Sequence, residues 1–107
     1  MSDPGKLDRR LTLEEPAEIA DGAGGVTRSY QAVATLWAQV VPVSARGTVD
    51  AERPGAVATH RIRIRSRSDI GTRHRLREGN AIYRIVALHD PDGRGRFLQI
   101  EAEARVD

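Results

Sequence analysis

Residues 59–77 read THRIRIRSRSDIGTRHRLR, and this stretch constrains the fold more than any other. Arginine takes every second position over residues 61–67 and again over residues 73–77. Successive side chains of a β-strand point to opposite faces. An extended segment therefore turns Ile62 and Ile64 toward a core and places a row of guanidinium groups on the other face. We call this row the arginine ladder and define it by Arg61, Arg63, Arg65 and Arg67.

The composition predicts a single domain over residues 1–107, with residues 1–6 as a flexible N-terminus. Of the 107 residues, 39% are hydrophobic and only 4% aromatic, so the core must be built mainly from leucine, isoleucine, valine and alanine. A core of this kind leaves a small stability margin. Binding of a partner subunit to the folded state adds stability, so we expect oligomerisation.

Several classes of chemistry find no support in the sequence. Cysteine is absent, which excludes disulfides and thiolate chemistry. The three histidines, His60, His74 and His89, match no metal-binding motif, and no nucleophile elbow is present. No apolar run approaches the roughly 18 residues of a membrane span, and no export signal is visible. We therefore expect a soluble intracellular protein that is not an enzyme, uses no cofactor or metal, and does not bind membranes.

Positive charge is concentrated in the second half of the chain. The net charge is +2, yet residues 1–60 carry six basic against eight acidic side chains, whereas residues 61–107 carry eleven arginines against seven acids. Residues 61–77 alone hold seven arginines and one acid, Asp69. A local field of this sign attracts polyanions or acidic protein surfaces.

The start of the chain predicts a strand followed by a tight turn. Residues 7–15 alternate leucine with polar residues, which favours a strand that ends at Pro16. Arg9 interrupts its apolar side. Residues 21–25 read DGAGG and predict a hairpin turn or wide loop, because glycine adopts positive φ at little cost.

A second strand and a long loop follow. Residues 26–44 are rich in β-formers, and Pro42 places the end of this strand at a sheet edge or bulge. The helical spacing of apolar residues over 30–40 leaves a helix open there. Residues 45–58 show no sustained period and predict a long mobile loop. We expect this loop to become ordered against neighbouring subunits, although simple disorder also stays open.

Three further strands are predicted after the ladder. They are a short strand over residues 72–76, a doubly covered central strand over 81–88, and a strictly alternating strand over 96–106, with a hairpin turn at 90–95. Five or six strands linked by Gly, Pro and Asp turns predict an all-β fold, a small antiparallel β-barrel or sandwich. The expected core residues are Leu11, Leu13, Trp37, Ile62, Ile64, Tyr83, Ile85, Leu98 and Ile100.

The order and spacing of these segments resemble the bacteriophage head-tail joining family, whose members are also described as head closure, stopper or head-tail adaptor proteins. The resemblance spans almost the whole chain. Its blocks are, in order, Leu7–Leu13, Asp21–Gly25, Leu36–Ala38, Thr59–Arg65, Asp69–Ile70, Gly79–Ile85 and Arg96–Glu101. One departure is Tyr30, where such proteins often carry tryptophan.

The resemblance implies a structural virion protein of a tailed phage or of a gene transfer agent. Such a protein assembles as a ring homo-oligomer between portal or adaptor proteins and tail terminator or tail tube proteins. Double-stranded DNA passes through this ring or is retained by it, without sequence specificity. The implied location is the head-tail interface of the virion, reached after assembly in the host cytoplasm.

Three roles stay open for the arginine ladder. It solvates an outer face, paired across the sheet with Glu101 and Glu103; it forms a subunit or portal-side interface; or it lines the ring channel and meets DNA phosphates. Two arginines of the long loop, Arg46 and Arg53, are further candidates for the interface or the channel.

The rival function is a nucleic-acid-binding β-barrel, similar in shape to an OB-fold, that grips phosphates with the Arg61–Arg67 strand. A binding module should lose DNA affinity in steps as arginines are replaced and as salt rises, whereas a connector monomer should bind DNA negligibly. Tyr83 and Phe97 are not expected to interleave with the ladder as base-stacking platforms do.

Overall fold

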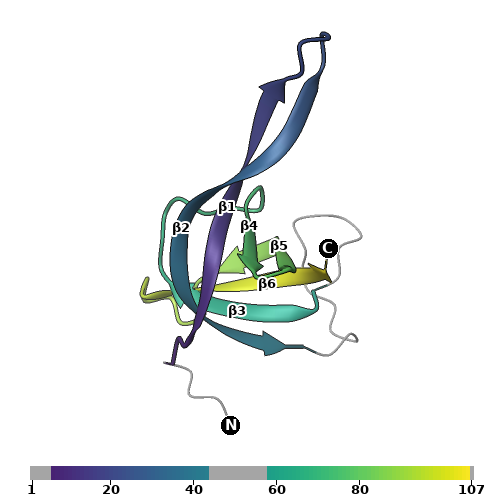
Figure 1. The fold of residues 1–107 in the computed structure, drawn as a ribbon. Helices are drawn as coiled ribbons and strands as arrows, with labels where there is room; N and C mark the ends of the chain where they lie inside the picture. Colours follow the sequence, from purple (N-terminus) through teal and green to yellow (C-terminus); the bar gives the residue numbers. More distant parts are fainter. Residues whose placement is uncertain (1–5, 44–57, 107) are drawn as a thin grey trace.

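Six antiparallel strands close into a barrel in the computed structural model, which describes residues 6–43 and 58–106 (Figure 1). The order around the barrel is β1-β2-β3-β6-β5-β4. The strands are β1 Arg9–Ala20, β2 Val26–Pro42, β3 His60–Arg65, β4 Arg75–Glu78, β5 Ala81–His89 and β6 Phe97–Val106. The all-β prediction is confirmed, and the helix left open over residues 30–40 is excluded because β2 occupies them. The predicted long loop lies almost entirely outside the described residues.

Three predicted boundaries were wrong. β1 continues through Pro16 because, beyond Glu14, it pairs only with β2, and a proline is tolerated on such an edge. β4 begins at Arg75 rather than at residue 72, since His74 and Gly71 form a turn in which each backbone N–H donates to the other residue. β3 ends at Arg65, which leaves Arg67 outside the strand.

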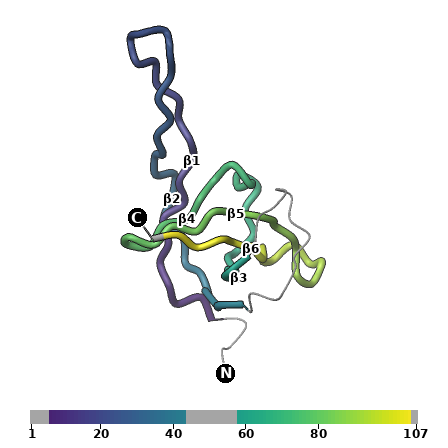
Figure 2. The backbone as a smooth tube through the Cα atoms, turned by 90° about the vertical axis from the view of Figure 1, so that its right-hand side faces the viewer, coloured from purple at the N-terminus to yellow at the C-terminus, as the bar shows by residue number. Residues whose placement is uncertain are grey.

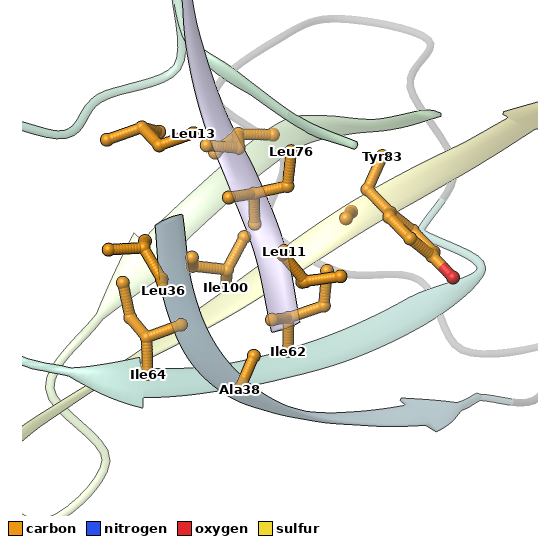
Figure 3. Packing of buried hydrophobic residues seen from close by; sticks show 11 residues of the cluster. Leu11, Leu13, Leu36, Ala38, Ile62, Ile64, Leu76, Tyr83 and Ile100 are labelled. Carbon is orange, nitrogen blue, oxygen red and sulfur yellow. The ribbon is translucent and has the colours of Figure 1, made fainter. Parts of the chain in front are cut away.

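Alternate residues of the strands fill the barrel interior (Figure 3). Of the expected core residues the structure buries Leu11, Leu13, Ile62, Ile64, Tyr83, Ile85 and Ile100. Leu98 is half-buried against this cluster. The assignment of Trp37 to the core was wrong, because Leu36 and Ala38 take the inward positions of β2 and strand alternation turns the indole outward. Trp37 is 55% exposed.

Beyond the barrel, β1 and β2 continue as a two-stranded projection, which we call the arm and define as residues 15–31 (Figures 1 and 2). A register shift between Leu13 and Glu14 marks the point where it leaves the barrel. The predicted turn closes its tip, where the Asp21 carboxylate accepts hydrogen bonds from the N–H groups of Ala23 and Gly25 at 2.8 and 3.1 Å. These bonds hold the pKa of Asp21 below its usual value.

Arg9 interrupts the apolar side of β1 because it stands at one end of the barrel interior. Its Nε donates to Glu78 Oε2 at 2.8 Å and a second nitrogen of the guanidinium donates to Oε1, a two-pronged contact that fixes both side chains. Nearby, the rings of His60 and Tyr83 meet edge to face at 5.3 Å. The hydrogen bonds from Arg9 lower the pKa of Glu78 from its ordinary value of 4.5.

The lowered pKa of Glu78 predicts a loss of stability in acid. A carboxylate whose pKa is lower in the folded state stabilises the fold above its unfolded pKa of 4.5, and this contribution disappears as pH falls through the lowered value. Because both side chains are partly exposed, the loss should be about 1 kcal/mol or less. Urea unfolding of Glu78→Gln at a series of acidic pH values should show a shallower pH dependence than the unaltered protein. An unchanged dependence would contradict the assignment, and Glu18→Gln on the exposed arm is the matched control.

Candidate assembly surface on the barrel and the arm

The arginine ladder lies on the outer face of β3, with Ile62 and Ile64 pointing into the barrel as the alternation predicted. The strand carries three ladder residues rather than four. Arg67 lies beyond its end, where Nε and a terminal nitrogen of the guanidinium donate to the two carboxylate oxygens of Asp69, each at 2.8 Å. This pairing raises the pKa of Arg67 and lowers that of Asp69. Arg46 and Arg53 lie outside the described residues.

Two ladder residues are held by partners across the β3–β6 pair. Arg61 Nε donates to Glu101 Oε1 at 3.2 Å, and Arg63 donates to Gln99 Oε1 at 3.4 Å. Glu101 is only 2% exposed, and within the described chain its Oε2 has no hydrogen-bond partner. The expected cross-strand contact is thus present for Glu101. Glu103 instead pairs with Arg105 of its own strand at 3.2 Å.

The remaining ladder residue, Arg65, belongs to a row of alternating arginine and aromatic side chains on the outer face. Arg65 pairs in register with Phe97 on β6, and Arg10 pairs with Trp37 on β2, with the Arg10 guanidinium 5.4 Å from the indole centroid. Trp37 and Arg65 line the same surface hollows. We call this row the arginine–aromatic patch; its members are Arg10, Trp37, Arg65 and Phe97. Over residues 6–43 and 58–106, Arg65 has no ion-pair partner.

The patch corrects one expectation from the sequence. Phe97 does interleave with the ladder, since it sits beside Arg65 and also lies 5.9 Å below the Arg63 guanidinium. Arginine and aromatic residues alternate across four neighbouring strands rather than along one strand. The row therefore cannot be recognised in the sequence before the strand order is known. Tyr83, by contrast, is buried in the core and takes no part in the patch.

Two shallow hollows flank the pair formed by Trp37 and Arg65. One has a volume of about 260 Å³ and is lined by residues 35–37 of β2 and by residues 64–67 at and beyond the end of β3. The other, of about 450 Å³, is lined by residues 6–8 at the start of the described chain. Exposed tryptophan and arginine side chains beside a surface hollow are typical of the energetic centre of a protein–protein interface. Such a surface suits a partner that offers both an aliphatic side chain and a carboxylate.

The arm is the second unusual surface. Among large apolar side chains, Ile19 is 58% exposed and Val26 is 64% exposed. Neither strand of the arm pairs with a third strand in the described chain, and a two-stranded hairpin alone is marginally stable in water. The sequence predicted both strands but not the arm. The available signal was the loss of large apolar residues after Leu13, where the chain continues Glu-Glu-Pro-Ala-Glu.

The base of the arm is fixed to the barrel by a group that we call the arm clamp, formed by Glu14, Tyr30 and Arg75. Glu14 Oε1 accepts a hydrogen bond from Arg75 Nε at 2.6 Å, and the Arg75 guanidinium lies 3.7 Å from the centre of the Tyr30 ring. Arg77 approaches the second oxygen of Glu14 at 3.5 Å. The side chains of Glu14 and Arg75 are 11% and 19% exposed, so both charges are largely removed from water.

Within residues 6–43 and 58–106, no three His, Asp or Glu side chains gather as metal ligands would. The same residues contain no helix long and apolar enough to cross a membrane. What the described surface does offer is a projecting arm and a basic, partly aromatic depression.

A closed barrel that carries a clamped arm and an exposed arginine–aromatic patch is a domain equipped to contact other protein chains. The chain belongs to the phage head completion protein family, whose model matches residues 2–105. The family resemblance drawn from the sequence is therefore confirmed.

Two solved structures are similar to this chain over nearly its whole length. A chain in the virion of a native gene transfer agent particle is 32% identical, with a TM-score of 0.68; the match covers 95% of this chain and 98% of that one. Protein SF1141 from Shigella flexneri 2a is 27% identical, with a TM-score of 0.72 and coverage of 95% and 96%. No curated protein sequence matches the chain.

Proposed function

We propose that this protein is a head closure subunit of a tailed phage or gene transfer agent. It assembles as a ring between portal or adaptor proteins and the tail, and helps to retain or pass packaged double-stranded DNA. Membership of the head completion family and the similarity to a chain of a virion support the head-closure role. The structural observation that carries the assembly step is the arm, a projecting two-stranded hairpin that exposes Ile19 on one face and Val26 on the other.

The pairing of three ladder arginines suits a ring through which DNA moves without being tightly bound. Arg61 and Arg67 are each paired with a carboxylate, and Arg63 contacts Gln99 and Phe97. Paired guanidinium groups release fewer counterions on meeting phosphates, so nonspecific DNA affinity is reduced. A protein that lets DNA cross rapidly has no use for tight phosphate contacts.

The test is loss and restoration of the protein in a strain that produces particles. Without it, electron microscopy should show DNA-filled heads separated from tails, and the yield of tailed particles should fall by at least about 100-fold, since joining then lacks a structural component. The unaltered protein supplied from a plasmid should restore tailed particles and be present in them. Normal numbers of tailed particles in its absence would disprove the head-closure role.

A second function, nucleic-acid binding, is favoured by one observation, the arginine–aromatic patch. Guanidinium groups beside exposed aromatic rings are the elements from which single-strand binding surfaces are built. DNA affinity measured against salt separates the two functions. A salt-dependent affinity of the free protein that disappears in Arg65→Ala favours binding, and negligible affinity favours head closure.

A further inference from the structure

We infer that the arm of one copy docks on the arginine–aromatic patch of a neighbouring copy, with Ile19 in the hollow beside Trp37 and Glu15 facing Arg65 or Arg10. This inference rests on the proposed function, because it assigns the contact that joins subunits in the ring. The patch and the arm are both exposed, and both belong to the described chain.

The arm cannot cover the patch of its own molecule. The Arg10–Trp37 pair and the Ala20–Val26 pair lie ten residues apart along the same two strands. At about 3.3 Å per strand residue, the tip of the arm is therefore about 30 Å from the patch. Figures 1 and 2 show the arm extending away from the barrel in both views. A contact between arm and patch must join two molecules.

Charge complementarity favours another copy of this chain as the occupant. The arm, residues 15–31, contains three carboxylates, Glu15, Glu18 and Asp21, against one arginine, Arg28, which pairs with Glu18 at 3.3 Å. Glu15 has no ion-pair partner over the described ranges. On the patch, Arg65 likewise forms no ion pair among the described residues, and Asp8, which lines the larger hollow with it, is accompanied there by Lys6. An unpaired acid on one surface thus corresponds to an unpaired base on the other.

The apolar parts also correspond. Residues paired directly across antiparallel strands share a face, so Glu15, Ala17 and Ile19 lie on one face of the arm with the polar residues Thr27, Ser29 and Gln31. The single large aliphatic group on this face is Ile19. The hollow is lined by residues 35–37 and 64–67, so the exposed Trp37 indole offers an apolar contact for an aliphatic side chain and Arg65 offers a charge for a carboxylate.

The symmetry of such a contact fits a ring. Arm and patch are different surfaces, so each copy gives its arm to one neighbour and its patch to another. Contacts of this head-to-tail type close into a ring when the rotation between copies allows it.

Disulfide trapping in assembled particles tests the contact, and the chain has no cysteine that would interfere. The double variant Ile19→Cys, Ser66→Cys places one thiol on the arm and one at the hollow. A disulfide requires Cα atoms about 4.4–6.8 Å apart. Mild oxidation of tailed particles should therefore give a series of covalent multimers on non-reducing gels. The matched control Ile19→Cys, Asn80→Cys moves the second thiol to the β4–β5 turn and should give no covalent multimers.

A charge exchange completes the test. In the trapping background, Glu15→Arg alone or Arg65→Glu alone should reduce cross-linking at least about tenfold, and the two together should restore it, because the ion pair is rebuilt with reversed sign. Thermal unfolding of each purified variant shows whether it folds.

The outcomes separate the inference from the proposed function. Tailed particles that contain the double-cysteine variant but yield no copy-to-copy disulfide would overturn the inference and leave head closure standing. A disulfide to a different virion protein, or equal cross-linking in the Asn80 control, would also overturn it. Particles that lack the protein altogether would instead count against head closure.

Discussion

Replacing Glu14 with alanine is expected to lower the free energy of unfolding by about 2–4 kcal/mol, because it leaves a largely buried Arg75 without its carboxylate. For a domain of this size, each kcal/mol corresponds to about 4–8 °C in Tm, so the variant should melt at least about 10 °C lower. The arm should also loosen, since the clamp joins its base to Arg75 on β4. Hydrogen exchange of the backbone amides in residues 15–31 should be faster than in the unaltered protein.

Glu18→Ala is the matched control for this prediction. Glu18 also pairs with an arginine, but the Glu18 and Arg28 side chains are 56% and 66% exposed. An exposed pair contributes about 0–1 kcal/mol, so this variant should unfold almost normally. Equal destabilisation by the two substitutions would show that burial of the arm clamp does not increase its contribution to the free energy of unfolding.

The sequence predicts the elements of this fold well because their signals are local. Alternation of apolar and polar residues over 61–65 and 96–106 indicates which side chains face the interior, and the glycines at 21–25 indicate the turn. The prediction failed for Trp37, where hydrophobicity was taken as evidence of burial. The alternation of Leu36 and Ala38 around it is the stronger indicator, because only one parity of a strand can point into a barrel.

The candidate site was only partly predictable because its members meet through strand order. Arg10, Trp37, Arg65 and Phe97 come from four strands, and they form a row only when β1, β2, β3 and β6 are neighbours. The arm clamp is equally nonlocal, since Glu14 and Arg75 are 61 positions apart in sequence. From the sequence, the arginine ladder indicated β3 as the candidate surface. Three of its four arginines, however, contact neighbouring side chains, and only Arg65 belongs to the arginine–aromatic patch.

The chain contains two kinds of large hydrophobic residue, those buried in the barrel core and those exposed on the surface. Ile62 is fully buried and belongs to the barrel core, whereas Trp37 and Ile19 are more than half exposed. Burying exposed apolar surface of this kind contributes to association rather than to folding of the free subunit. Substitutions in the core should therefore mainly lower the free energy of unfolding, whereas substitutions of exposed apolar residues should mainly weaken assembly.

Trp37→Thr is accordingly expected to abolish most particle assembly while the monomer remains folded. Threonine keeps a residue that favours β-strands, and Trp37 is 55% exposed, so the free energy of unfolding should change by about 1 kcal/mol or less. Loss of a central tryptophan from an interface costs about 2 kcal/mol or more, which corresponds to roughly 30-fold weaker binding for each contact. The yield of tailed particles should fall at least about tenfold.

Ile62→Ala provides the contrast in the neighbouring strand. It should cost about 2–5 kcal/mol of folding free energy, because it removes methyl groups from a closed core. Particle yield should then fall in proportion to the amount of folded protein, and lowering the growth temperature should recover part of it. The same low temperature should not rescue Trp37→Thr, whose defect lies in the contact between subunits. Recovery of both variants on cooling would mean that Trp37 acts through stability and that the patch is not an assembly surface.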